Sequence, residues 1–156
     1  SVGRFLDSVS ALLGICLERT YEGEPAIKLE ASARGGKTEQ VDDILTREND
    51  LIVVDTTKFL EWILEHLELP LKDLSATVLY SLGKALGEIA ALSCSKATLN
   101  EVFVGGGAAV NSYLFRGIRD ALAEEEINVR LPRRVPAGDG GIALGQAAIV
   151  IAREIV

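Results

Sequence analysis

Apolar residues recur at helical spacing in several stretches of the chain, and this pattern predicts most of its secondary structure. In the first stretch, 4–18, apolar side chains stand three and four positions apart, which is typical of an amphipathic helix. Similar patterns predict further helices over 25–33, 57–68, 73–95, 111–124 and 141–155. Pro25 is suited to open the second helix, and either Asp55 or Thr56 caps the third.

Short apolar runs between these helices predict strands. They are LIVVD at 51–55, which we expect to belong to a strand pair, EVFVG at 101–105 and NVRLP at 128–132. Strands that alternate with helices toward the C-terminal half favour an α/β layered fold. The apolar run 140–152 is interrupted by Gln146 and is shorter than a membrane span, so we predict a buried core helix there.

Three consecutive glycines stand between a predicted strand and a predicted helix in VFVGGGAAVN, 102–111. This arrangement can aim backbone N–H groups at an anion, most often a phosphate. No Gly-Lys-Ser/Thr follows, so the stretch is not a Walker loop, and it lacks the dinucleotide-binding pattern. Asn111 either caps the helix or belongs to such an anion site.

A second glycine-rich stretch, PAGDGGIALGQ, places Asp139 among Gly138, Gly140 and Gly141. The aspartate is either an ordinary helix cap or an exposed carboxylate that a ligand or metal can approach. The lone histidine, His66, lies in an amphipathic helix and is interpreted as a surface residue. A complete metal site would therefore need ligands from outside this chain.

The opening helix carries a second stripe, made of small residues and one carboxylate: Gly3, Asp7, Ser10, Ala11 and Gly14. Such a face allows another backbone or a ligand to approach closely. The pattern alone favours tight helix packing with Asp7 in solvent.

Composition and charge narrow the class of protein. The chain has 156 residues, 48% of them hydrophobic and 25% charged, which suits one soluble domain. A net charge of −7 makes nucleic acid a poor partner. The basic cluster Arg130, Arg133 and Arg134 is either a solvated loop or a contact for an anionic ligand. Cys16 and Cys94 stand in apolar surroundings, typical of reduced core residues in a cytoplasmic protein.

The chain contains no methionine, and its helical pattern is already established at residue 5. We therefore expect a single domain that is a fragment of a longer protein.

Four blocks of the sequence resemble, in order and spacing, the C-terminal part of the HypF carbamoyltransferases, which act in NiFe-hydrogenase maturation. These blocks are SVGRFLDSVSALLG, TYEGEPAIKLE, VGGGAAVN and LPRRVPAGDGGIALGQA. The TsaD family, which makes threonylcarbamoyladenosine in tRNA, is more distantly similar. The resemblance covers essentially the whole chain and implies the second lobe of an actin-like ATPase (ribonuclease H-like) fold, a mixed sheet with flanking helices.

The resemblance also implies roles for individual residues, none of them catalytic. Six would contact the nucleotide: Asp7, Gly23, Glu24, Gly106, Gly107 and Asn111. Asp139 would be a metal ligand, and the metal-binding histidines of the family lie in the first lobe, outside this chain. The loop departs from the usual family pattern, since GGGAAVN stands where Ser-Gly-Gly-Val-Phe-Gln-Asn is common.

In the mechanism of that family, carbamoyl phosphate and ATP yield carbamoyl-adenylate, and the carbamoyl group passes to a cysteine of the partner protein HypE. The resemblance thus implies ATP or carbamoyl-adenylate and a divalent metal, Fe or Zn, as cofactors. The expected partners are the first lobe and a HypE-like acceptor, without a membrane, and an exposed lobe face would allow self-association. We expect the isolated chain to be inactive. The alternatives are a tRNA threonylcarbamoyl transferase-like lobe and a non-catalytic nucleotide-binding module.

Overall fold

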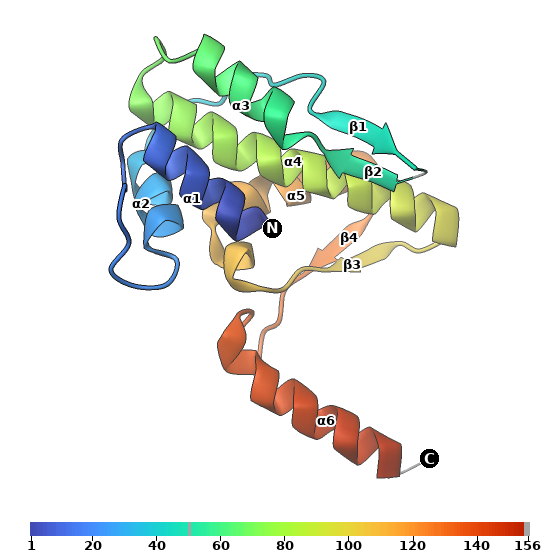
Figure 1. Ribbon diagram of the computed structural model, residues 1–156. Helices are drawn as coiled ribbons and strands as arrows, with labels where there is room; N and C mark the ends of the chain where they lie inside the picture. Colours follow the sequence, from blue (N-terminus) through green and yellow to red (C-terminus); the bar gives the residue numbers. More distant parts are fainter. Residues whose placement is uncertain (50, 155–156) are drawn as a thin grey trace.

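A 27-residue helix, α4 (Leu71–Ala97), runs through the middle of the molecule (Figure 1). The computed structural model describes residues 1–49 and 51–154. The elements before α4 are α1 (Val2–Leu12), α2 (Glu24–Ser32), β1 (Leu45–Glu48), β2 (Leu51–Val54) and α3 (Thr56–Glu65). Those after it are β3 (Glu101–Phe103), α5 (Ser112–Glu124), β4 (Asn128–Arg130) and α6 (Ile142–Glu154), with short 3₁₀ turns η1 (Gly107–Val110) and η2 (Asp139–Gly141).

Glycines allow the backbones of α4 and α5 to touch. A Cβ atom on Gly83 of α4 would lie 2.0 Å from the carbonyl oxygen of Leu114, and one on Gly117 of α5 would lie 2.2 Å from that of Tyr80. Neither distance is compatible with a side chain, and a backbone carbonyl cannot move aside as a flexible side chain would. The two helices therefore pack closer together than Ala–Ala contacts would permit.

The hydrophobic core surrounds α4. Leu114, Ile118 and Leu122 of α5 line one side of it, and α1, α2 and α3 form a layer on the other side. Phe5 of α1 and Phe59 of α3 place their ring centroids 5.2 Å apart at the centre of this layer. Fully buried apolar residues from each helix surround them, namely Leu6, Val9, Leu29, Ile63, Leu74 and Leu79. Asp55 caps α3 by accepting hydrogen bonds from Thr57 N and Lys58 N, which selects it over Thr56 as the capping residue.

The first helix ends earlier than its apolar pattern predicts. Gly14 adopts φ +67°, a left-handed conformation that suits glycine and stops a helix. Its N–H donates to Ala11 O, and Ile15 N–H donates to Ser10 O. The apolar residues after Gly14 therefore belong to an irregular segment. Cys16 within this segment and Cys94 in α4 are buried free thiols, as predicted.

The strands form two small sheets of two strands each in the described residues, where the resemblance implies a mixed sheet. The pair β1–β2 is an antiparallel hairpin, in which Leu45 faces Val54. The pair β3–β4 is parallel, with Val102 opposite Val129. The expected strand pair around 51–55 is confirmed, and the overall α/β class is that of the predicted fold.

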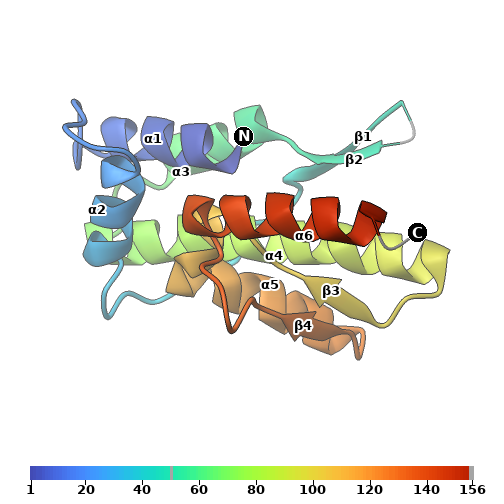
Figure 2. The same ribbon diagram turned by 90° about the horizontal axis from the view of Figure 1, so that it is seen from below.

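The last helix, α6, is not the buried core helix that its sequence predicts. It stands apart from the other helices in Figure 1, and Ile142, Leu144, Ile149, Val150 and Ile151 are each between 55% and 60% exposed. Figure 2 looks along the direction of this separation, so α6 overlaps the other helices in that view. Residue 155, at the end of the predicted helix, lies outside the described residues. Within those residues, no helix combines the length and the apolar character needed to cross a membrane.

Substitution Gly83→Ala should destabilise the fold by about 3 kcal/mol, at the upper end of overpacking costs, because the new methyl group forces α4 and α5 apart. Urea unfolding followed by circular dichroism measures the effect. Gly3→Ala is the control, because a Cβ there meets nothing within 4 Å, and its effect should stay within about 0.5 kcal/mol. Equal stability of both variants would contradict the close helix contact.

Candidate functional site

The two glycine-rich loops singled out in the sequence lie against each other. Each follows the carboxyl end of a strand in the parallel pair β3–β4, and the carboxyl ends of parallel strands meet at the same edge. The N–H of Gly106 donates to Ala137 O at 2.6 Å. A Cβ on Gly138 would lie 3.6 Å from the Cα of Gly107. The loop that contains Gly106 and Gly107 and the loop that contains Asp139 thus form one surface.

The glycines in this surface have different physical roles. Gly106 has φ +97° and ψ 166°, a combination that essentially only glycine adopts. Position 141 requires glycine because the backbone of Pro136 lies very close to it, and a Cβ there would lie 2.5 Å from Pro136 O. A Cβ on Gly107 would meet nothing within 4 Å, so the fold leaves the space beside it open.

The N-terminus of α5 is already occupied by protein groups. The side-chain oxygen of Asn111, which is buried, accepts from Leu114 N at 3.0 Å, so Asn111 is the cap of α5. The carboxylate of Glu30 in α2 accepts from Ser112 N at 2.7 Å and from its hydroxyl at 2.6 Å. These acceptors fill the positions that an anion would take at a bare helix end.

Donors that could face a ligand therefore lie just before α5. In the part of the chain that the structure describes, the backbone N–H groups of Gly107 and Ala108 have no hydrogen-bond acceptor. The side-chain amide nitrogen of Asn111 also lacks one there. Three N–H donors next to an open backbone can hold phosphate or sugar oxygens.

Asp139 contributes a carboxylate to the same surface. Asp139 is exposed, and its carboxylate makes no hydrogen bond or ion pair within the described residues, so it does not act as a helix cap. The structure shows no group of three or more His, Cys, Asp or Glu among these residues that could hold a metal ion. His66 is partly exposed at the end of α3, where its ring stacks on Trp62, and it is not part of this surface.

The remaining predicted nucleotide contacts lie on α1 and at the start of α2. The side chain of Asp7 is 24% exposed, and its carboxylate is 3.7 Å from the guanidinium of Arg4. Gly23 has φ +80° and precedes α2. Gly23 is seven residues from Glu30, a rise of about 10 Å along α2 from the residue that contacts the start of α5. The structure thus places the predicted nucleotide residues in two groups.

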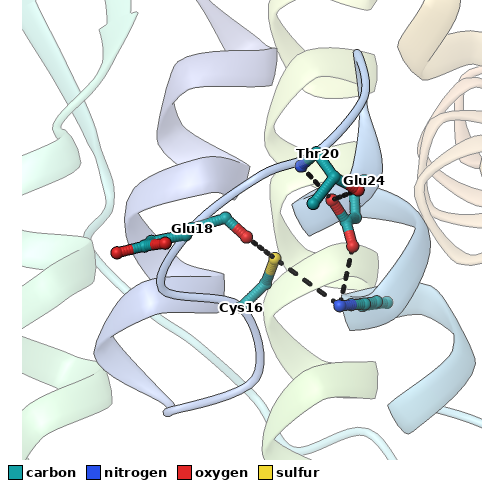
Figure 3. Close-up of polar contacts among 5 residues, drawn as sticks. Cys16, Glu18, Thr20 and Glu24 are labelled. Atoms are coloured by element: carbon teal, nitrogen blue, oxygen red, sulfur yellow. Dashed lines mark hydrogen bonds and ion pairs between the residues drawn. The ribbon is translucent and has the colours of Figure 1, made fainter.

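The carboxylate of Glu24 is held inside the protein (Figure 3). One oxygen accepts from Thr20 N at 2.5 Å and from the Thr20 hydroxyl at 3.0 Å, and the other lies 2.8 Å from Lys28 Nζ. Lys28 Nζ also lies 3.9 Å from the sulfur of Cys16. The network ties the segment after α1 to the first turn of α2. A direct contact between Glu24 and a nucleotide stays a prediction.

The same network sets the ionisation of Glu24. The hydrogen bond from Lys28, followed by that from the Thr20 backbone, lowers the pKa of Glu24 to about 2. The bond to Glu24 raises the pKa of Lys28 in turn. The pair is therefore fully charged at neutral pH.

Two further polar features are the basic cluster after β4 and a cavity beside α4. Arg130 pairs with Glu101 across β3 and β4, whereas Arg133 and Arg134 lie on the exposed segment that leads to Asp139. A cavity of about 500 Å³ opens between the segment 38–45 and α4. No residue predicted to bind nucleotide or metal lines this cavity.

The sequence does not predict the residues that hold this surface in place but have no direct role in binding a ligand. Glu30 is separated from Ser112 by 82 positions, so no local pattern connects them. Ala137 fixes the glycine loop through its carbonyl oxygen, a group that every residue type has.

Comparison with known proteins gives consistent matches. Residues 1–146 match the family model described as "Carbamoyltransferase, Kae1-like Domain, second subdomain". The chain is 35% identical, over 99% of its length, to a probable carbamoyltransferase HypF of Methanocaldococcus jannaschii, and 32% identical to the carbamoyltransferase HypF of Rhizobium leguminosarum bv. viciae over 100%. In each case it spans 20% of the relative.

Two solved structures have the same fold. The crystal structure of T. kodakarensis HypF matches with a TM-score of 0.81 and 33% identity, over 94% of this chain and 19% of that one. A full-length HypF in its phosphate- and nucleotide-bound form matches with a TM-score of 0.80 and 32% identity, over 96% of this chain and 24% of that one.

Replacement of Glu24 by Gln should weaken the dependence of stability on acid pH. Because the folded state lowers the pKa of Glu24, its ionised form stabilises the protein above the ordinary carboxyl range, and this stabilisation is lost as pH falls through that range toward about 2. Urea unfolding at several pH values between about 5 and about 2.5 measures the loss.

The wild-type chain should lose more stability over this interval than Glu24→Gln does. Glu22→Gln is the matched control, because the carboxylate of Glu22 is 87% exposed. If Glu24→Gln and Glu22→Gln gave parallel pH profiles, the buried network would not hold Glu24 as described.

Proposed function

Because the chain belongs to the HypF family of carbamoyltransferases, as the second subdomain of their Kae1-like domain, we propose that it is the nucleotide-binding lobe of such an enzyme. The chain spans about a fifth of the length of the curated relatives that it matches, so the activity of the whole protein is part of the proposal. The lobe binds ATP or carbamoyl-adenylate on the surface formed by the two glycine-rich loops.

One observation carries this proposal. Among the described residues, N–H donors without an acceptor and a carboxylate without a partner lie together at the carboxyl ends of β3 and β4. The N–H groups of Gly107 and Ala108 and the amide of Asn111 bind the oxygens of the nucleotide. Asp7 and Gly23 approach its ribose or adenine from the second group of residues. A solved relative is described as phosphate- and nucleotide-bound, which supports the same ligand class here.

Asp139 fits the role of one ligand to a divalent metal, either Fe or Zn. Its carboxylate is exposed and has no hydrogen-bond or ion-pair partner among the described residues. A carboxylate is a known ligand for both ions. The described residues offer no further set of ligands, so the other ligands come from the first lobe. When bound, the metal polarises the carbamoyl or phosphate oxygens.

The reaction proposed for the parent protein follows from these roles. Hydrolysis of carbamoyl phosphate releases phosphate and carbamate, and the carbamate attacks ATP to give carbamoyl-adenylate and pyrophosphate. The cysteine thiolate of a HypE-like acceptor then takes the carbamoyl group during NiFe-hydrogenase maturation, and AMP leaves. The residues of this lobe hold the nucleotide half of the donor and orient its carbamoyl group toward the acceptor thiolate. The buried free thiols of Cys16 and Cys94 suit the reducing cytoplasm, where we place this reaction.

Isothermal titration calorimetry with ATP and ADP tests nucleotide binding by this lobe. Gly106→Ala should weaken binding at least about tenfold, because a φ of +97° is strained for alanine by about 1–3 kcal/mol and the loop must rearrange.

Gly35→Ala is the control, since Gly35 also has a positive φ, +70°, but follows α2 and belongs to neither glycine-rich loop. Its affinity should stay within about twofold of the wild-type value. Equal affinity in Gly106→Ala, or no binding by the wild-type chain, would contradict a nucleotide site formed by this lobe.

A further inference from the structure

The cavity between the segment 38–45 and α4 has a wall that the protein holds in place by itself. Near one end of the segment, Glu39 N–H donates to the hydroxyl of Thr77 at 3.0 Å. At the other end, Asp55 N–H donates to Ile44 O at 2.7 Å. The volume of about 500 Å³ lies in the range of cavities that take small ligands. The cavity is therefore formed before any ligand binds.

A buried hydroxyl without a partner opens into this cavity. Ser81 of α4 is only 7% exposed and lines the cavity. Its hydroxyl makes no hydrogen bond within the described residues. Of the fully enclosed side-chain oxygen and nitrogen atoms there, only Ser10 Oγ lacks a partner, so Ser81 Oγ is not enclosed and faces the cavity that it lines. Buried polar groups normally have a partner, and this one is left for a ligand.

The lining of the cavity is mainly negative. Four carboxylates belong to it, those of Glu39, Asp42, Asp43 and Glu88. Within the described ranges, 1–49 and 51–154, the carboxylates of Glu39, Asp43 and Glu88 have no hydrogen-bond or ion-pair partner. The ammonium group of Lys84 also belongs to the lining, but it lies 3.7 Å from the carboxylate of Glu124. A hollow lined by one sign of charge concentrates ligands of the opposite sign and repels phosphate groups.

The carboxylates lie at separate points along α4. Glu39 is held at Thr77, and the eleven residues from Thr77 to Glu88 rise by about 16 Å along the helix. Ser81 lies between these two ends. No group of three or more His, Cys, Asp or Glu in the described part of the chain could hold a metal ion. The arrangement therefore suits several positive charges spread along one molecule better than it suits one compact metal ion.

Apolar groups complete the lining between the charged ends. Ile44 and Ala85 are 5% and 3% exposed and belong to the cavity wall together with Val41. Such a wall can cover methylene groups, which gain free energy when they leave water. The cavity thus combines carboxylates at its ends with an apolar wall and a hydroxyl between them.

We propose that this cavity binds a linear aliphatic polyamine. Its terminal ammonium groups pair with the carboxylates of Glu39 and Glu88, and its methylene groups lie on Ile44 and Ala85. The hydroxyl of Ser81 accepts a hydrogen bond from an amine nitrogen between the two ends. None of the residues proposed to bind nucleotide lines the cavity, so the inference holds whether or not the glycine-rich loops bind ATP.

Isothermal titration calorimetry of the 156-residue chain at low salt tests this proposal, with spermidine as the probe. The matched control ligand is 8-aminooctanol, which has the same chain length as spermidine but only one positive charge. We expect one spermidine to bind per chain, about tenfold more tightly than the amino alcohol. Added salt should weaken the binding of spermidine, because its charges are screened.

Two variants address the two kinds of contact. Ser81→Ala and Glu88→Gln should each weaken spermidine binding about tenfold. Ser93→Ala is the control for the first, because the Ser93 hydroxyl donates to Ile89 O on an exposed part of α4 that does not line the cavity. Glu61→Gln, on the exposed face of α3, is the control for the second. Both controls should bind spermidine as the wild-type chain does, and circular dichroism confirms that each variant is folded.

Three outcomes would overturn the proposal. In the first, the wild-type chain shows no saturable binding of spermidine. In the second, the amino alcohol binds as tightly as spermidine, so the site takes a single ammonium group. In the third, Ser81→Ala and Glu88→Gln bind spermidine as well as their controls do, which would assign the binding to the acidic surface in general.

Discussion

The backbone contact between α4 and α5 is the constraint on which the position of the candidate site depends. Gly83 and Gly117 bring the two helices together with no side chain between them. Because α5 is held at this distance, its capping residue Asn111 and the loop before it have a fixed place beside α2. A larger residue at either glycine would shift the start of α5 relative to Glu30, and the loop surface with it. The stability of the fold and the geometry of the site thus depend on the same two positions.

The chemistry of the site depends on which backbone N–H groups already have a hydrogen-bond acceptor within the protein. Asn111 and Glu30 satisfy the start of α5, while the N–H groups of Gly107 and Ala108 stay without acceptors in the described chain. The carboxylate of Asp139 is exposed near these donors and has no protein partner there. Donors and a carboxylate left open side by side suit a phosphate ester with a bound metal better than they suit a structural role.

Sequence predicted the helices and the two loops because short-range patterns determine them. Apolar periodicity identified α3, α4 and α5, and glycine clustering identified the loops around Gly106 and Asp139. Long-range contacts are not predictable from local patterns, since the Glu30–Ser112 bond and the pairing of β3 with β4 join distant positions. The sequence predicts the apolar character of α6, but burial also requires a covering surface, and the described residues do not supply one.

The central claim is that the two glycine-rich loops, rather than the cavity beside α4, receive the nucleotide. Two-dimensional amide NMR spectra of the chain, recorded while ATP is added, test it most directly. We expect the shifted amide signals to gather at Gly106, Gly107 and Ala108 and at the loop that contains Asp139. Shifts that gather instead at the cavity lined by 38–45 and Lys84, or spectra that do not change, would contradict it.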